Sequence, residues 1–162
     1  MPQEIQLHVA SFAELDLRTL YELLRLRVDV FVVEQECAYP ELDGRDTEPG
    51  TRHLWLEKHG VPVAYLRLLD DGAVQRIGRV AVTRNARGRG FAARLMAQAL
   101  AIIGPMPCVL DAQTYLVDFY AGFDFLATGP EYVEDGIPHL PMRRDPAVPA
   151  PQSGEGGPLP RE

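Results

Sequence analysis

Residues 80–92 read VAVTRNARGRGFA, and this stretch decides the fold. Its first three residues end a predicted strand, and its last two begin a predicted helix. The start of a helix presents free backbone N–H groups and the positive end of the helix dipole, and glycine lets an anion approach the backbone. Arg87 and Arg89 add positive charge beside Gly88 and Gly90. The stretch therefore predicts an anion-binding loop, or alternatively a glycine-containing turn with solvated arginines.

Apolar periodicity on both sides of this loop predicts the other elements. The clearest helix covers 90–103, where apolar side chains recur at helical spacing until Gly104-Pro105 ends the pattern. A second helix is predicted over 17–31, followed by a long loop over 34–52. Shorter elements are predicted as strands over 4–9, 53–58, 61–69, 74–82 and 108–112, a helical segment over 115–122, and closing strands over 123–128, 131–134 and 139–143. This order predicts an α/β (α+β) fold in which helices flank a mixed central sheet.

The length and composition predict one globular domain. The chain has 162 residues, of which 46% are hydrophobic and 24% charged, enough apolar material for one core. We assign residues 1–144 to this domain and interpret the Pro/Gly-rich segment 145–162 as a flexible tail. No apolar stretch approaches the roughly 20 residues that span a bilayer, and the first residues lack the pattern of a secretory signal. We therefore expect a cytoplasmic protein that does not contact membranes.

The charge and the reactive side chains argue against several classes of function. A formal net charge of −7 disfavours nucleic-acid binding and favours a cationic or amine substrate. Cys37 and Cys108 lack CxxC spacing, and the four histidines lack the spacing of metal ligands, so we expect no metal site. Lys58 is the only lysine, and both serines lie towards the ends of the chain. Schiff-base and serine-nucleophile mechanisms therefore lack good candidates.

The loop resembles a known cofactor motif. Arg87, Gly90 and Ala92 match the (Q/R)xxGx(G/A) motif of the GNAT superfamily of N-acetyltransferases, in the expected place between a strand and a helix. The resemblance implies a mixed sheet of about six to seven strands and acetyl-CoA as the donor. It also implies that Val80 and Val82 pair with the pantetheine arm. The pyrophosphate of coenzyme A would then be bound by Arg87, Gly88, Arg89, Gly90, Phe91 and Ala92.

A second motif lies downstream at the matching place. Gln113, Tyr120 and Asp124-Phe125 resemble the Nx6Yx3GF pattern of the same superfamily. The resemblance implies that Tyr120 donates a proton to the departing thiolate; the alternative is a half-buried core tyrosine. Gln113 stands in place of the commoner asparagine and keeps an amide that can contact coenzyme A. Asp124 stands in place of the usual glycine, which leaves the geometry of this turn open.

Three further segments resemble the ElaA branch of the superfamily: 27–35, 39–46 and 134–139. With the two cofactor motifs, the resemblance covers roughly residues 15–144. It implies that a neutral primary amine attacks the thioester directly, and that a backbone N–H of the strand Val80–Val82 stabilises the oxyanion. The acceptor would be the amine of a small molecule or a peptide, and a homodimer is one option.

The acceptor side has several candidate residues. We predict Glu34 as the general base, with His139 and Glu134 behind it; the alternative for Glu34 is a solvated or salt-bridged carboxylate. Acidic residues from both ends of the domain predict a pocket for a cationic acceptor, with Asp43, Asp46, Glu134 and His139 as substrate-binding candidates, beside Glu36, Glu41, Glu131 and Asp135. The alternative is that these loop charges are simply solvated. We also expect Arg67 and Arg79, on predicted strands, to be structural partners of some of these acids, because an arginine is costly to bury unpaired.

Three other functions remain open from the sequence. Acyl-homoserine-lactone synthases share the fold, and some N-terminal charged and aromatic residues here resemble theirs in spacing, although those enzymes lack a close RxxGxA match. A coenzyme A-binding sensor would keep the anion-binding loop without turnover, but it would not need an acid at the position of Tyr120. Nucleic-acid binding would depend on a local group of arginines, Arg84, Arg87, Arg89 and Arg94.

Overall fold

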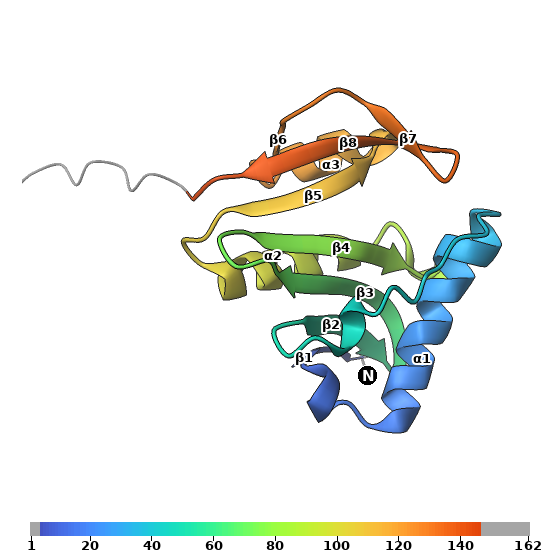
Figure 1. The fold of residues 1–162 in the computed structure, drawn as a ribbon. Coiled ribbons are helices and arrows are strands. Elements are labelled where there is room, and N and C mark those ends of the chain that lie inside the picture. Colours follow the sequence, from blue (N-terminus) through green and yellow to red (C-terminus); the bar gives the residue numbers. More distant parts are fainter. Residues whose placement is uncertain (1–3, 147–162) are drawn as a thin grey trace, which may run out of the picture.

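Eight strands form one mixed sheet in this protein. The computed structural model describes residues 4–146, so residues 147–162 of the predicted tail lie outside it. The strand order is β1-β2-β3-β4-β5-β8-β6, and β7 pairs with β8 (Figure 1). The strands are β1 (Ile5–Ala10), β2 (Arg52–Lys58), β3 (Val61–Asp70), β4 (Gln75–Val82), β5 (Cys108–Gln113), β6 (Leu126–Ala127), β7 (Tyr132–Glu134) and β8 (Ile137–Arg144). The predicted fold class is confirmed, with a sheet one strand larger than the six to seven predicted.

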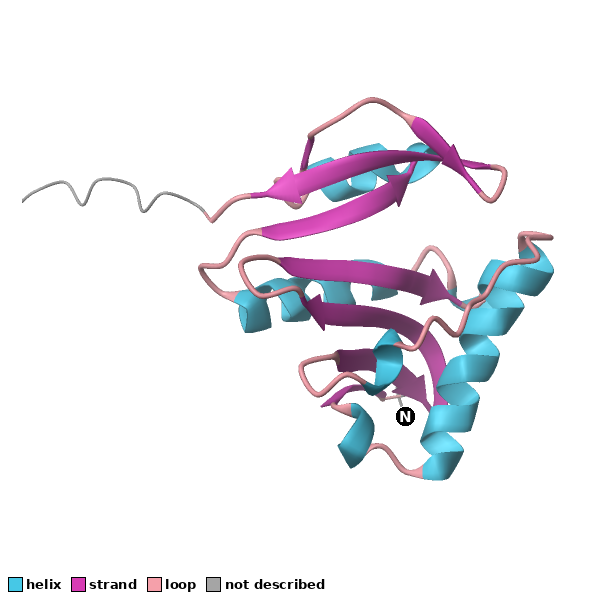
Figure 2. Cartoon of the chain, viewed as in Figure 1, coloured by secondary structure: helices cyan, strands magenta, loops and turns pink. Residues whose placement is uncertain are grey.

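Helices cover both faces of the sheet (Figure 2). The helices are α1 (Leu17–Val28), α2 (Phe91–Ile103) and α3 (Val117–Ala121). A π-helical turn, η2 (Asp29–Glu34), continues α1. The 3-10 turns are η1 (Phe12–Glu14), η3 (Arg45–Thr47), η4 (Arg84–Ala86) and η5 (Thr114–Leu116). Side chains alternate across a strand, so neighbouring residues of β3 face opposite layers. Tyr65 packs with Leu23 and Leu26 of α1, whereas Leu66 packs with Leu95 of α2 and its neighbours.

The first helix differs from its prediction at its C-terminal end. It begins where the sequence indicates, because the side chain of Asp16 accepts a hydrogen bond from the Thr19 amide at 2.7 Å and caps the helix. The α-helix was predicted to reach Phe31, but it ends at Val28 and continues as the π-helical turn η2 to Glu34. The apolar stripe does not reveal this change, since one wider turn still buries Val30 and Phe31.

The sheet opens between its two central strands. The parallel strands β4 and β5 are paired only at Gln75 with Cys108 and at Arg76 with Val109. Beyond these pairs β4 follows β3 while β5 stays paired with β8, and the two diverge (Figure 1). β4 also contains a bulge. Gly78 pairs with Arg67 of β3 and Ala81 pairs with Tyr65, so that β4 has one more residue than β3 between these two pairs. The divergence leaves two open strand edges facing each other.

Candidate active site

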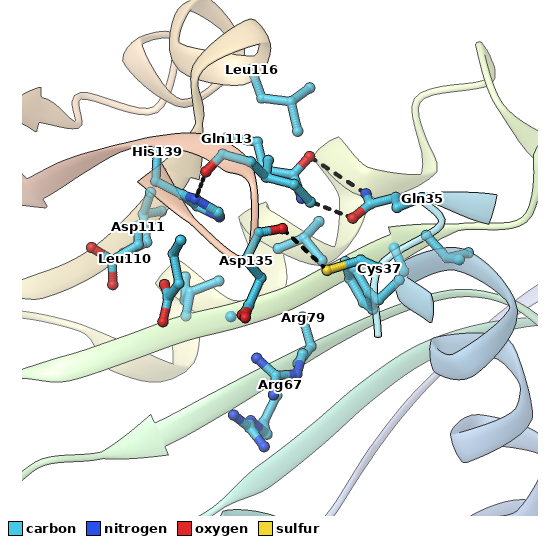
Figure 3. Close-up of a pocket in the computed structure, with 18 of the residues that line it drawn as sticks. Gln35, Cys37, Arg67, Arg79, Leu110, Asp111, Gln113, Leu116, Asp135 and His139 are labelled. Atoms are coloured by element: carbon cyan, nitrogen blue, oxygen red, sulfur yellow. Dashed lines mark hydrogen bonds between the residues drawn. The ribbon is translucent and has the colours of Figure 1, made fainter. Parts of the chain in front are cut away.

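A cavity of about 750 Å³ lies where β4 and β5 diverge (Figure 3). This volume is within the usual range for small-molecule sites. Its walls come from β4, β5, the end of η2, the loop after η2 and the β7–β8 hairpin. The predicted site residues that line it are Glu34, Asp43, Val80, Val82, Arg87, Ala92, Gln113, Tyr120, Glu134 and His139. Residues from distant parts of the sequence thus meet at one opening in the sheet.

The segment 87–92, here called the glycine loop, has the geometry of an anion-binding site. Gly88 and Gly90 have φ of +76° and +75°, and a Cβ built on either would meet no atom within 4 Å, so the backbone is open to a ligand. The first backbone bond of α2 runs from the Arg94 amide to the Gly90 carbonyl at 3.1 Å, which leaves the amides of Phe91 and Ala92 without an intrahelical acceptor. The Phe91 side chain packs in the core, so only its amide is available to a ligand.

The part of β4 that lines the cavity contains the bulge and extends beyond the end of the ladder with β5. Arg79 has φ of +53°, a left-handed conformation that is uncommon for arginine. The extra residue interrupts the ladder with β3 between Gly78 and Ala81. Val80 and Val82 line the cavity on this strand. The edge of β4 is therefore free to pair with an extended ligand.

Tyr120 lies in the core and at the cavity wall at once. It is 6% exposed, belongs to the core beside Phe125, and lines the cavity from α3. Burial raises the pKa of the Tyr120 phenol, so the hydroxyl keeps its proton at neutral pH. The turn that follows takes a left-handed φ of +69° at Asp124, a conformation that aspartate adopts more readily than most residues. Asp124 thus fits where the superfamily usually has glycine.

Glu34 is held by Arg87 of the glycine loop and by Arg84 of the preceding turn η4. Its carboxylate accepts hydrogen bonds from Nη1 and Nη2 of Arg87, both at 2.6 Å, and from Nη2 of Arg84 at 3.2 Å. The bonds from Arg87 lower the pKa of Glu34 to about 2. A carboxylate of that pKa is a weak proton acceptor at neutral pH, so this geometry argues against Glu34 as the general base. The salt-bridged alternative describes the arrangement better.

His139 has a free ring nitrogen in the cavity. Its Nδ1 lies 2.7 Å from the Ile137 carbonyl oxygen, which can only accept, so the neutral imidazole carries its proton on Nδ1. The lone pair of Nε2 is then available. The ring stacks on Tyr132 at 5.7 Å between centroids, which holds it in place. Glu134, from the same hairpin, also lines the cavity.

The predicted acidic pocket is largely neutralised by arginine. Arg67 donates to Asp43 twice at 2.8 Å, and Asp46 accepts from Arg27 at 2.7 Å. Burial alone would raise the pKa of Asp46, but the hydrogen bonds from Arg27 and the charges of both arginines hold it below its usual value. Asp46 is 7% exposed and lies outside the cavity wall, so the structure does not place it where the predicted substrate-binding role requires.

The ion pairs form one network with balanced charge, buried at Arg27, Arg67, Glu41 and Asp46 and partly exposed at Arg79 and Asp43. Three arginines, Arg27, Arg67 and Arg79, face three carboxylates, Glu41, Asp43 and Asp46. The network joins α1, β3 and β4 to the long loop over 34–52, in agreement with the expectation that Arg67 and Arg79 are structural partners of some of these acids. No net charge is left in this group to attract a cation.

Two residues that line the cavity, Gln35 and Cys37, were not predicted as site residues. Gln35 exchanges hydrogen bonds with Gln113 at 3.3 and 3.4 Å, and the Cys37 thiol lies 3.5 Å from the Asp135 carbonyl (Figure 3). Both follow η2 in a segment without periodicity, and their partners are far away in sequence. Within residues 4–146, no cluster of three or more histidine, cysteine, aspartate or glutamate side chains is placed to hold a metal ion. None of the helices in this range is long and apolar enough to cross a membrane.

Comparison with known proteins identifies relatives over most of the chain. The family model described as "Acetyltransferase (GNAT) domain" matches residues 24–146. UPF0039 protein Rv2851c of Mycobacterium tuberculosis is 54% identical over 136 residues, which cover 81% of this chain and 87% of that protein. Protein ElaA of Escherichia coli is 41% identical over 140 residues, covering 82% and 92% respectively.

Solved structures agree with these relatives. An acyl-CoA N-acyltransferase from Pseudomonas aeruginosa superposes with a TM-score of 0.83 at 41% identity, over 87% of this chain and 99% of that chain. The acyl-homoserine-lactone synthase BjaI superposes with a TM-score of 0.73 at 18% identity, over 90% of this chain and 85% of that one, which is a likeness of fold alone. The chain belongs to the GNAT family of acetyltransferases, in which it is ElaA-like.

Proposed function

We propose that this protein is an N-acetyltransferase that transfers the acetyl group of acetyl-CoA directly to a primary amine. One observation carries the proposal: a single cavity is lined by Arg87 and Ala92, at the two ends of the glycine loop, by the free edge of β4 and by the buried hydroxyl-bearing Tyr120. Gly88, Arg89, Gly90 and Phe91 lie between those two ends, next to the cavity wall and not in it. These residues fit coenzyme A, because the loop offers backbone amides to a pyrophosphate and the strand edge offers an extended arm its pairing groups. Family membership supports acyl transfer, and the name of the Pseudomonas relative supports nitrogen as the acceptor atom.

Each part of the site has a role in this reaction. Acetyl-CoA supplies a thioester, whose carbonyl is open to attack by a neutral amine. The amides at the start of α2 bind the pyrophosphate, and Val80 and Val82 align the pantetheine arm. A backbone N–H freed by the bulge after Arg79 stabilises the oxyanion, and Tyr120 protonates the departing sulfur.

The acceptor end of the cavity remains acidic at its rim. Glu134 and Asp135 are exposed on the β7–β8 hairpin at the cavity, and no ion pair to either occurs within residues 4–146. They favour a cationic amine of a small molecule or a peptide. Asp43 also faces the cavity, but its charge is shared between Arg67 and Arg79. A homodimer and a cytoplasmic location stay predictions.

We assign the general base to His139 in place of Glu34. Replacing His139 by glutamine should lower kcat by about 10²-fold, the lower end for acid–base catalysis, because water can take over part of the proton transfer. Thiol release at saturating amine and acetyl-CoA measures this fall. His59→Gln, at the exposed β2–β3 turn, is the control; an unchanged kcat in the His139 variant would exclude this base.

Binding of the donor is tested by thermal unfolding with acetyl-CoA, coenzyme A and S-adenosylmethionine. Ligand at 100 times its dissociation constant adds about 2.7 kcal/mol, or a rise in Tm of several degrees. We expect this rise with both coenzyme A ligands, and its loss in Gly90→Asp, where a carboxylate occupies the anion site.

The matched control for this variant is Gly60→Asp. Gly60 has φ of +73° and open space around it, like Gly90, but it lies at the β2–β3 turn, so the same backbone strain arises away from the cavity. That variant should unfold at lower temperature yet keep the full ligand shift. No shift with saturating coenzyme A in the native protein would refute the proposed donor, and a shift with S-adenosylmethionine would point to lactone synthesis instead. Thiol release with amines separates an enzyme from a coenzyme A-binding sensor.

A further inference from the structure

The π-helical turn η2 ends at Glu34, and Gln35 follows it directly; these two adjacent residues reach opposite sides of the cavity. Glu34 contacts Arg84 and Arg87, which follow β4. Gln35 contacts Gln113, the last residue of β5 (Figure 3). β4 and β5 are no longer paired in this part of the sheet, since the last pair between them is Arg76 with Val109. The end of η2 therefore connects the two walls where the sheet itself does not.

The contacts of Glu34 fix the approach to the glycine loop. Arg84 is the first residue of the 3-10 turn η4, and Arg87 follows this turn directly before Gly88. One carboxylate binds both arginines, and the Nε of Arg87 also donates to the Val82 carbonyl at 3.1 Å. The Arg87 side chain is thus held at both ends of its guanidinium group, beside the strand end and the loop. This arrangement limits the conformations that the loop amides can adopt before a ligand binds.

These contacts add local order more than overall stability. The side chains of Arg84 and Arg87 are 80% and 43% exposed, and exposed ion pairs contribute only about 0–1 kcal/mol to folding. A bidentate pair, however, defines a geometry well, because both N–H groups of the fork must be aligned. Binding of a flexible loop costs ordering entropy that a fixed loop has already lost.

We propose that Glu34 is a positioning residue for the acyl donor: through Arg87 and Arg84 it holds the glycine loop in the conformation that binds the pyrophosphate. Gln35 acts with it by tying the end of β5 to the same turn. The inference rests on the proposed function, but it assigns Glu34 to donor binding and not to proton transfer. It predicts that removing the carboxylate changes affinity for coenzyme A and leaves the chemical step nearly intact.

The test is Glu34→Gln, which keeps the size of the side chain and removes its charge. We expect the Kd of coenzyme A, measured by calorimetry, and the KM of acetyl-CoA to rise about tenfold, with kcat within about twofold. The Tm without ligand should change by less than about 2 °C, because the pairs are exposed. Arg87→Gln should weaken binding similarly, and the double variant should be clearly less than additive, since both changes break one contact.

Asp29→Asn is the matched control, because it removes an exposed carboxylate at the start of the same turn, outside the cavity wall, and it should leave Kd, KM and kcat unchanged. An unaltered or tighter Kd in Glu34→Gln would overturn the inference. So would a large fall in kcat at constant KM, which would restore Glu34 as a base. If the native protein itself fails to bind coenzyme A, the proposed function fails instead, so the two failures are distinguishable.

Discussion

Replacing Arg27 by alanine is expected to lower the free energy of unfolding by about 3–5 kcal/mol, the range for removing one partner of a buried ion pair. Arg27 is 1% exposed on α1, and its guanidinium group donates to Glu41 and to Asp46, each at 2.7 Å. It also lies over the ring of Tyr65, 5.4 Å from the centroid. Alanine would leave two buried carboxylates short of a donor in a region closed to water.

Urea unfolding measures this loss, and the m-value should stay constant if only stability changes. Arg25→Ala is the control on the same helix: its side chain is 64% exposed and the one ion pair that it makes within residues 4–146, to Glu22, spans 3.8 Å, so a change within about 0.5 kcal/mol is expected. The loss in free energy of unfolding for Arg27→Lys should lie between those of the two alanine variants, because lysine keeps the charge but not the planar guanidinium group. A loss below about 1 kcal/mol for Arg27→Ala would mean that the network contributes little to the fold.

Replacing Tyr120 by phenylalanine is expected to lower kcat by about 10²- to 10⁴-fold while the KM of acetyl-CoA changes little. The ring packs in the core beside Phe119 and Phe125, and phenylalanine preserves those contacts. Only the hydroxyl is lost, so stability should change by less than the loss of a whole ring would cause. The fall in rate then reports proton donation to the departing sulfur.

Thiol release at saturating amine measures the effect, and the donor can be varied to test its cause. In an acetyl thioester of a more acidic thiol, the thiolate leaves without needing a proton. With such a donor, the difference in kcat between Tyr120→Phe and the native protein should therefore shrink. Tyr21→Phe, exposed on α1, is the control. An equal rate for Tyr120→Phe and native protein with acetyl-CoA would assign Tyr120 to the core alone.

The elements that decide the fold could be predicted because their periodicity is strong. The strand predicted over 74–82 is observed as Gln75–Val82, and the helix predicted over 90–103 as Phe91–Ile103. Both bury one side against the same core, so the apolar pattern carries the structure directly. The prediction of a closing strand over 123–128 was wrong in extent. Asp124 adopts a left-handed conformation, and within this segment Leu126–Ala127 alone pairs with β8.

The chemistry of the acidic residues could not be predicted because it depends on partners distant in sequence. Glu34 meets Arg87 across 53 residues, and Asp46 meets Arg67 across 21. A carboxylate in a loop has the same sequence pattern whether it faces a substrate, water or an arginine. The π-helical turn that brings Glu34 and Gln35 to the cavity also leaves no trace in an apolar stripe. The glycine loop was easier to predict, since its conformation needs specific residue types.

The divergence of β4 and β5 has a consequence for aggregation. Unpaired strand edges are templates on which another polypeptide can add, and proteins usually block them with charges, bulges or short strands. Here two such edges lie inside the sheet, between Ile77–Val82 and Leu110–Gln113. The left-handed Arg79 twists one edge, and the ion pair of Arg76 with Asp111, at 3.0 Å, joins the two strands where their ladder ends. A bulge and a charge pair therefore stand on these edges, and both are features that oppose the addition of a second chain.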